Sequence, residues 1–287
     1  MCLFKKYSIF LLFFYVSCTS NPFWDDPKST ESTITGKIAL SSFNKTIPLL
    51  IWDQNFNILT KTDSSGYFSI PLTSFTDEEQ KISGLLKIYF FALNYGVDSA
   101  NIFLRNGFLS DNQTDFDKNG SLIKNIILNK LIEGHLSITN PEMNYDQSDT
   151  LLVSFRLKAL DFVDVKTYKY IHNSFECSSG LFFKSLENNN IIKFNHFGFD
   201  QNGNLINDQI KYIQYDRNEV SLWNYYISKT DLNLESGRYL IVPYLKINKN
   251  TFPMENIERV DSNYSFFFSD DYLNIPSDFI LDTLIIR

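Results

Sequence analysis

Cysteine and histidine are both scarce in this sequence, at three residues each among 287. Cys2, Cys18 and Cys177 form no C-x-x-C pair, so the sequence indicates neither a disulfide framework nor a cysteine-rich zinc site. The three histidines show no H-E-x-x-H spacing, which argues against a zinc peptidase. We therefore expect no bound metal, and we interpret Cys177 as a small buried apolar residue.

Motifs of nucleophilic and nucleotide-dependent enzymes are missing as well. The chain contains no G-x-S-x-G elbow, no phosphate-binding loop and no G-x-G-x-x-G fingerprint. Positive charge is in deficit, because 26 Lys and Arg stand against 33 Asp and Glu. Nucleic acids and anionic lipid headgroups favour basic patches, so neither is an expected partner. We expect a protein with no catalytic residues and no cofactor.

The longest early apolar run is too short to cross a membrane. It extends from Ile9 to Val16 and follows the basic residues Lys5 and Lys6, whereas a spanning helix needs about 20 apolar residues. A basic start, a short apolar centre and a small residue at its end are typical of an export signal. Residues 1–17 are therefore predicted to be a cleaved signal peptide.

The end of this signal resembles the lipobox of bacterial lipoproteins. The four residues are Tyr15-Val16-Ser17-Cys18, and Tyr15 departs from the usual Leu. The resemblance implies lipid on Cys18, which would anchor the chain permanently in a membrane. Thr19 follows where Asp would indicate inner-membrane retention, so an outer-membrane location is expected, with the leaflet open. The alternative is an ordinary cleaved signal in which Cys18 is incidental.

After the signal, the composition predicts a polar tether and then two all-β domains. Residues 18–32 are polar and include Pro22 and Pro27, a composition that buries too little apolar surface to order itself. From Thr33 onward, short apolar runs alternate with turn residues in the period of two expected of strands. The polar stretch around Asn140-Pro141 is the predicted boundary. It divides two consecutive β-sandwiches at residues 33–140 and 141–287.

The first of these domains resembles the carboxypeptidase regulatory-like family. The matching segments are Thr35-Gly36-Lys37-Ile38, the strand from Ile47 to Trp52, and the hairpin Thr62-Asp63-Ser64-Ser65-Gly66-Tyr67-Phe68. The resemblance implies a seven-stranded prealbumin-like sandwich, with no activity attached to the motif itself. In larger proteins this domain often accompanies a peptidase, but no peptidase is expected in this chain.

One turn pattern occurs three times in the chain. An Asp is followed three positions later by a Gly that starts a new strand, so the Asp side chain can bond the turn backbone and the Gly supplies a positive φ. The three pairs are Asp63 with Gly66, Asp117 with Gly120, and Asp200 with Gly203.

Two patterns in the second domain indicate an immunoglobulin-like or fibronectin-like sandwich. Leu234-Glu235-Ser236-Gly237-Arg238-Tyr239 has the L-x-x-G-x-Y spacing of a tyrosine corner, in which the Tyr hydroxyl bonds back to the preceding backbone. Trp223 and Tyr225 share one face of a predicted strand. They either fill the core or form a surface that contacts a sugar or a protein partner.

These observations favour a non-catalytic, membrane-anchored lipoprotein with a binding or structural role at the bacterial cell envelope. Its partners would be membrane lipid through Cys18 and an unidentified envelope protein or glycan. One alternative is a surface lipoprotein that binds glycans and assists carbohydrate uptake, which requires exposed aromatics such as Trp223 and Tyr225. Another is a hydrolase whose site carries none of the known motifs.

Overall fold

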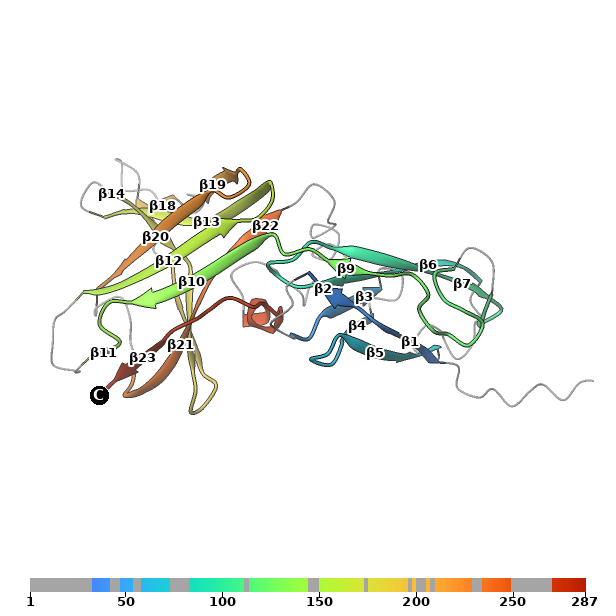
Figure 1. The fold of residues 1–287 in the computed structure, drawn as a ribbon. Helices are drawn as coiled ribbons and strands as arrows, with labels where there is room; N and C mark the ends of the chain where they lie inside the picture. Colours follow the sequence, from blue (N-terminus) through green and yellow to red (C-terminus); the bar gives the residue numbers. More distant parts are fainter. Residues whose placement is uncertain are drawn as a thin grey trace, which may run out of the picture.

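β-strands run through almost the whole described part of the computed structural model (Figure 1). The structure describes residues 33–41, 47–53, 58–72, 83–110, 114–143, 150–172, 175–195, 198–199, 205–206, 210–228, 234–248 and 270–287. Within these ranges, the helical element with defined bounds is the 3₁₀ turn η3 (Asp270–Asn274). No helix in them is long and apolar enough to cross a membrane. The predicted all-β class with sandwich domains is confirmed.

Three sheets form the N-terminal unit, which contains β1 to β9. One sheet has the order β4-β3-β6-β7-β8, with bounds β3 (Leu50–Asp53), β4 (Ile58–Lys61), β6 (Gly84–Phe91), β7 (Asp98–Arg105) and β8 (Phe108–Leu109). The other two sheets have two strands each: β1 (Thr33–Lys37) pairs with β5 (Tyr67–Pro71), and β2 (Ala39–Leu40) pairs with β9 (Ile127–Leu128). Alternate strand residues such as Ile34, Phe68 and Ile102 are buried between the sheets, as the period of two requires.

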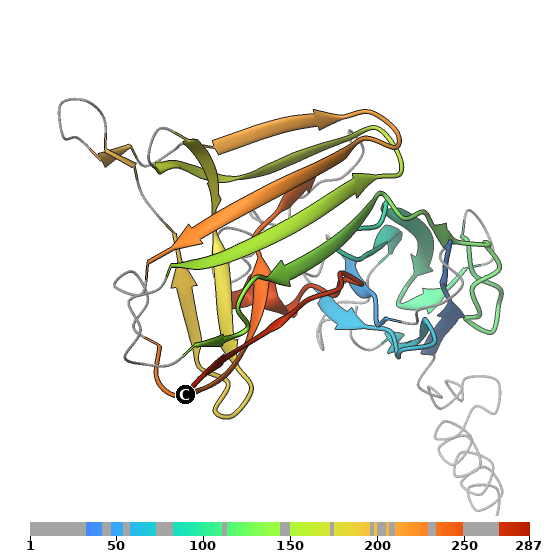
Figure 2. The same ribbon diagram turned by 60° about the vertical axis from the view of Figure 1, so that its left-hand side comes forward.

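The C-terminal unit contains β10 to β23 around a second core. One sheet is β10 (Ile132–Ile138), β12 (Leu151–Ala159) and β20 (Val220–Ile227), whose green to orange strands lie side by side in both views (Figure 2). The facing sheet is β11 (Glu142–Met143), β23 (Thr283–Ile286), β21 (Gly237–Pro243), β15 (Leu181–Ser185) and β16 (Ile191–Phe194). Phe155, Phe183 and Ile241 fill the space between them.

Further strands extend this unit beside the first sheet. β13 (Val163–His172) pairs with β14 (Phe175–Ser179), β19 (Ile210–Tyr215) and β22 (Lys246–Asn248), and β17 (Gly198–Phe199) pairs with β18 (Leu205–Ile206). Val163, Val165 and Tyr215 turn inward and join the core of the C-terminal unit. The extension therefore enlarges the same hydrophobic core.

The division between the units differs from the predicted boundary at residues 140 and 141. The strand β10 falls before that boundary, yet it pairs along its whole length with β12, from Ile132 opposite Ala159 to Ile138 opposite Val153. Its buried residues, including Leu136, belong to the C-terminal core. The change of unit therefore comes ahead of Ile132. The polar stretch after Ile138 is a loop inside the C-terminal unit, because loop composition alone does not distinguish a linker from a strand connection.

The C-terminal segment joins the two sheets of its unit along one side. Its start runs beside β10, where Ile280 accepts a hydrogen bond from the Leu136 amide at 2.8 Å and donates one to the Gly134 carbonyl at 3.0 Å. Its end, β23, then pairs with β21 and β11 in the facing sheet. One segment of the chain thus satisfies backbone groups of β10 in one sheet and of β11 and β21 in the facing sheet.

Candidate functional site

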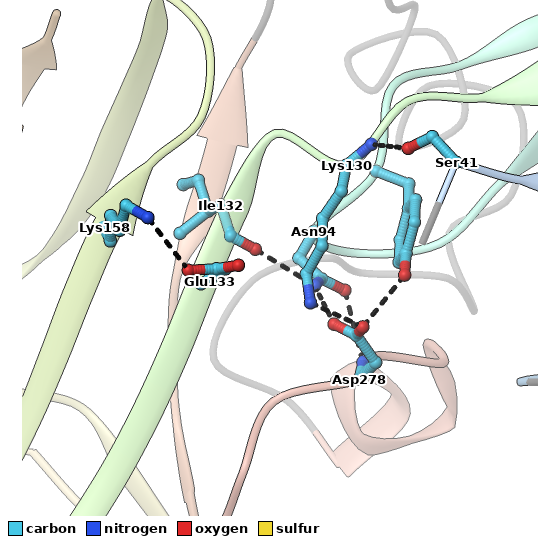
Figure 3. Close-up of polar contacts among 8 residues, drawn as sticks. Ser41, Asn94, Lys130, Ile132, Glu133, Lys158 and Asp278 are labelled. Atoms are coloured by element: carbon cyan, nitrogen blue, oxygen red, sulfur yellow. Dashed lines mark hydrogen bonds and ion pairs between the residues drawn. The ribbon is translucent and has the colours of Figure 1, made fainter. Parts of the chain in front are cut away.

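A buried carboxylate lies where the two units meet. Asp278, between η3 and β23, accepts hydrogen bonds from the Lys130 ammonium at 2.6 Å and the Tyr95 hydroxyl at 2.8 Å, and a further one from the Asn94 amide (Figure 3). Its side chain is 2% exposed and that of Lys130 is 16% exposed. Because every donor is held within hydrogen-bonding distance, the cost of burying the charge is offset locally.

Asn94 connects three segments within this polar cluster. It follows β6 in the N-terminal unit and is fully buried. Its side-chain amide also donates to the Ile132 carbonyl at 3.2 Å, and its carbonyl oxygen Oδ1 accepts from the Asp278 amide at 3.3 Å. Its backbone carbonyl accepts from the Leu131 amide at 2.9 Å. One side chain and its own backbone therefore tie β6, the start of β10 and the C-terminal segment together.

The electrostatics of the cluster favour the ionised form of Asp278. Burial by itself raises the pKa of this carboxyl group. The hydrogen bonds from Lys130, Asn94 and Tyr95 and the positive charge of Lys130 outweigh that effect, so the pKa lies below its ordinary value. A carboxylate held in this state is suited to a permanent ionic contact, whereas a general acid needs a raised pKa.

An aromatic cluster covers the same junction. Leu50, Trp52 and Phe91 from the N-terminal unit pack in one buried cluster with Tyr272 and other residues of the C-terminal unit, which are Phe182, Tyr244 and Ile275. The ring of Tyr272 stacks on Phe182 with centroids 5.5 Å apart. Burial raises the pKa of the Tyr272 hydroxyl, which accepts a hydrogen bond from the Leu245 amide at 3.0 Å. The outer face of the β3–β6 sheet is thus partly covered by the other unit.

This arrangement joins the two sandwiches through buried contacts. The described residues contain no group of three or more His, Cys, Asp or Glu side chains that could hold a metal ion. Cys177 lies in β14 and is 2% exposed, as interpreted from the sequence. The junction combines apolar burial with one satisfied charge, which is the chemistry of a stable interface between domains.

Two of the three predicted turns share one hydrogen-bonding pattern. Asp63 Oδ1 accepts from the amides of Ser65 at 2.8 Å and Tyr67 at 2.9 Å, and the Gly66 amide donates to the Asp63 carbonyl at 3.1 Å. Gly66 has φ of 83°, a conformation that an L-residue adopts only with strain. Hydrogen bonds, with Ser65 first, hold the pKa of Asp63 below its ordinary value.

The second turn repeats this pattern at the other end of β1. Asp117 Oδ1 accepts from the amides of Asn119 at 2.9 Å and Ser121 at 2.8 Å, and Gly120 also has φ of 83°. The Gly120 carbonyl accepts from the Thr35 amide at 2.8 Å, as the Gly66 carbonyl does from Ile38 at 2.9 Å. Both turns therefore extend the hydrogen bonding of β1. They are structural elements of the N-terminal unit.

The third turn and the lipidation residue lie outside the described residues. Asp200 and Gly203 fall between β17 and β18, whose antiparallel pairing is described. Cys18, with the predicted signal and tether of residues 1–32, precedes the first described residue, Thr33.

Trp223 and Tyr225 are core residues, so their interpretation as ligand contacts is wrong. They are 1% and 0% exposed and belong to the C-terminal core. The indole nitrogen of Trp223 donates to the Tyr215 hydroxyl at 3.0 Å, inside the unit. The face of β20 that reaches solvent carries Leu222, which is 59% exposed. The alternation along β20 predicts one buried and one exposed face, as the structure shows, but tertiary packing decides which face is buried.

Tyr239 makes the backbone contact that its spacing predicts. Its hydroxyl donates to the Glu235 carbonyl at 2.9 Å, four residues upstream and just before β21 begins. Burial raises the pKa of this hydroxyl, so it is a donor at all ordinary pH values. The contact closes the corner that leads into β21.

The residues that join the units were missed by sequence reasoning. Asn94 and Asp278 are 184 positions apart, and neither belongs to a motif. A faint signal is that Asn94 closes the apolar sequence that continues from β6 through Ala92 and Leu93, and an Asn that is buried there needs hydrogen-bond partners. The identity of those partners comes from the fold.

Comparisons with known proteins show no family for this chain. No protein-family model matches it, and no curated protein matches it. Among solved structures it is similar to the crystal structure of BcpA, the major pilin subunit of Bacillus cereus, at 8% identity and a TM-score of 0.22. The match covers 74% of this chain and 87% of the pilin chain. Because the TM-score is so low, this similarity supports no conclusion about the chain. The all-β assignment rests on the described strands.

Proposed function

We propose that this chain is a non-catalytic lipoprotein of the bacterial cell envelope. In this proposal, lipid on Cys18 anchors it in the outer membrane, and two β-sandwich units act together as one structural body. The observation that carries the structural role is the junction, where Asp278 bonds Asn94, Tyr95 and Lys130 and an aromatic cluster packs beside them. Buried contacts of this kind keep two domains in a fixed orientation.

The anchor itself is supported by the sequence. A basic start, an apolar run of limited length and Cys18 at its end form one continuous pattern. The carboxypeptidase regulatory-like family remains part of the proposal for the N-terminal unit. The geometry of the Asp63–Gly66 turn supports that resemblance, because the turn adopts the conformation that the motif requires.

The glycan-binding alternative has lost its main support. It depended on exposed aromatic side chains at Trp223 and Tyr225, which stack on sugars only when they reach solvent. Both are buried. We therefore propose a structural or protein-binding role at the envelope.

The anchor is tested by replacing Cys18. The chain is expressed with its own signal in a Gram-negative host, and the Cys18→Ala variant is compared with wild type and with Cys2→Ala, a matched control inside the signal. We expect Cys18→Ala to move to the soluble exported fraction, and the other two to stay with the membrane. Mass spectrometry of the N-terminal peptide checks acylation. Retention of Cys18→Ala in the membrane fraction at the wild-type level would refute the lipid anchor.

A further inference from the structure

A tight hairpin at one end of the N-terminal unit presents an aromatic and a basic side chain to solvent. Asn106 and Gly107 connect β7 to β8 with φ of 52° and 79°, the two positive values of a type I′ turn. The Ser83 hydroxyl accepts a hydrogen bond from the Asn106 amide at 2.8 Å and braces the turn. Arg105 and Phe108 are paired across it. Phe108, which directly follows this hydrogen-bonded turn, is 50% exposed.

The neighbouring strands add apolar side chains on the same face. Leu85 of β6 is directly opposite Phe103 of β7. Leu85 is 51% exposed, while the intervening residues Leu86, Ile102 and Leu104 are buried on the inner face. We call Leu85, Phe103, Arg105 and Phe108 the hairpin face. The described residues of β6, β7 and β8 that alternate onto this outer face include the basic residues Lys87 and Arg105. They include no Asp or Glu.

The hairpin face lies at the end where the chain enters the N-terminal unit. The opposite end is the junction, where β6 leads into Asn94, and where Ser41, just after β2, bonds the Lys130 amide at 2.9 Å. Thr33, the start of β1, and Gly84, the start of β6, are thus both at the end away from the C-terminal unit (Figure 1). The described chain therefore begins, at Thr33, at the end that carries the hairpin face.

We propose that the hairpin face rests on the membrane surface to which the chain is anchored. The inference depends on the lipid anchor proposed above. Fourteen residues, Thr19 to Ser32, separate Cys18 from β1. For the flexible tether that the composition predicts, this length corresponds to an end-to-end distance of about 20 Å, which would keep this end of the molecule close to the headgroups. At that distance the membrane is present at a high effective concentration, so a weak surface contact is sufficient.

The chemistry of the hairpin face fits a lipid interface. Exposed Phe and Leu side chains reach the boundary between headgroups and acyl chains, and Arg105 can keep its charge at headgroup level while its stem packs on apolar neighbours. The acidic chain as a whole gains nothing from an anionic membrane. The proposed contact with the membrane is therefore made mainly by apolar side chains. It depends on the lipid anchor to hold the protein at the membrane. The Asn-Gly turn keeps the side chains in place without further ordering.

The experiment places a tryptophan probe on the hairpin face. In a Trp24→Phe background, Phe108→Trp is compared with Leu222→Trp, which is at a similarly exposed position on the C-terminal unit. The lipidated chain is purified from membranes and reconstituted in phosphatidylcholine and phosphatidylethanolamine vesicles with brominated acyl chains. Trp52 and Trp223 remain in this background and are buried. Relative to the background protein, we expect the brominated lipid to quench the added fluorescence of Phe108→Trp and not that of Leu222→Trp. Leu85→Trp serves as a second probe if Phe108→Trp does not fold.

The outcomes separate this inference from the anchor on which it rests. Vesicles that carry the protein but leave positions 108 and 85 unquenched would overturn the membrane contact and leave the anchor standing. Equal quenching at position 222 would also overturn it, because the contact would not be specific to this face. If the native chain carries no lipid, the anchor fails. The same measurement after coupling Cys18 to a maleimide lipid then still decides the membrane contact.

Discussion

The hydroxyl of Tyr95 donates a hydrogen bond of 2.8 Å to the carboxylate of Asp278, and so joins the N-terminal unit to the C-terminal segment. The two residues are 183 positions apart. The same carboxylate forms an ion pair with the ammonium group of Lys130. A charge in this position is stabilised only while both units are folded and in contact, so the stability of each unit depends on the other.

The first prediction concerns the charge of Asp278. The substitution Asp278→Asn removes the partner of the Lys130 ammonium and should lower the free energy of unfolding by about 2–4 kcal/mol. Calorimetry of the wild type should show one transition, and the variant should begin to separate into two. The control is Lys158→Ala at the exposed Lys158–Glu133 pair (Figure 3), where the change should stay within about 0.5 kcal/mol. Wild type unfolding in two well-separated steps would contradict the coupling of the units.

The second prediction is a pH dependence of stability. Because the pKa of Asp278 is lowered in the folded state, its contribution to stability is fully present above the unfolded pKa of about 3.9. It is lost as the pH falls through the lower folded pKa. Thermal unfolding of wild type and Asp278→Asn should therefore converge as the sample is acidified below about pH 4. If the difference in melting temperature between wild type and Asp278→Asn stayed constant on acidification, the ionised Asp278 carboxylate would not be the source of the stabilisation.

The third prediction addresses the Asp-x-x-Gly turns. A Cβ on Gly66 would lie 2.1 Å from the Ile38 carbonyl oxygen, at a φ of 83°. Gly66→Ala should therefore destabilise the protein by about 2–4 kcal/mol, since backbone cannot move aside cheaply. At Gly96 the nearest atom is 3.6 Å away, so Gly96→Ala should be tolerated. Chemical denaturation of the two variants measures the contrast, and equal stabilities would show that the turn is not constrained.

The fourth prediction compares two buried tyrosines. Tyr239→Phe removes the donor to the Glu235 carbonyl and should cost about 1–3 kcal/mol. The Tyr225 hydroxyl is buried and has no hydrogen-bond partner in the described part of the chain. Tyr225→Phe should thus preserve stability or raise it, because a desolvated polar atom is removed. The two melting temperatures, measured side by side, test the tyrosine corner. The stabilising role of this corner is refuted if Tyr239→Phe has the same melting temperature as wild type.

Local patterns in the sequence predicted local structure well. The spacing of Asp63 and Gly66 was sufficient for the turn, because the Asp side chain bonds amides only two and four positions away. The corner at Tyr239 is equally short in range. The strand β10 was assigned to the wrong unit, because its alternation is compatible with either sheet and only its pairing with β12 decides. The same limit explains Trp223, whose face of β20 could have been turned to either side.

By itself, the sequence determined the all-β class, the Asp-x-x-Gly turns and the tyrosine corner, since these depend on side chains within a few residues of one another. Only the tertiary structure decided which strand faces are buried, where one unit ends, and that Asn94, Tyr95, Lys130 and Asp278 meet. Such contacts join residues far apart along the chain, and their energy depends on burial that no local pattern specifies.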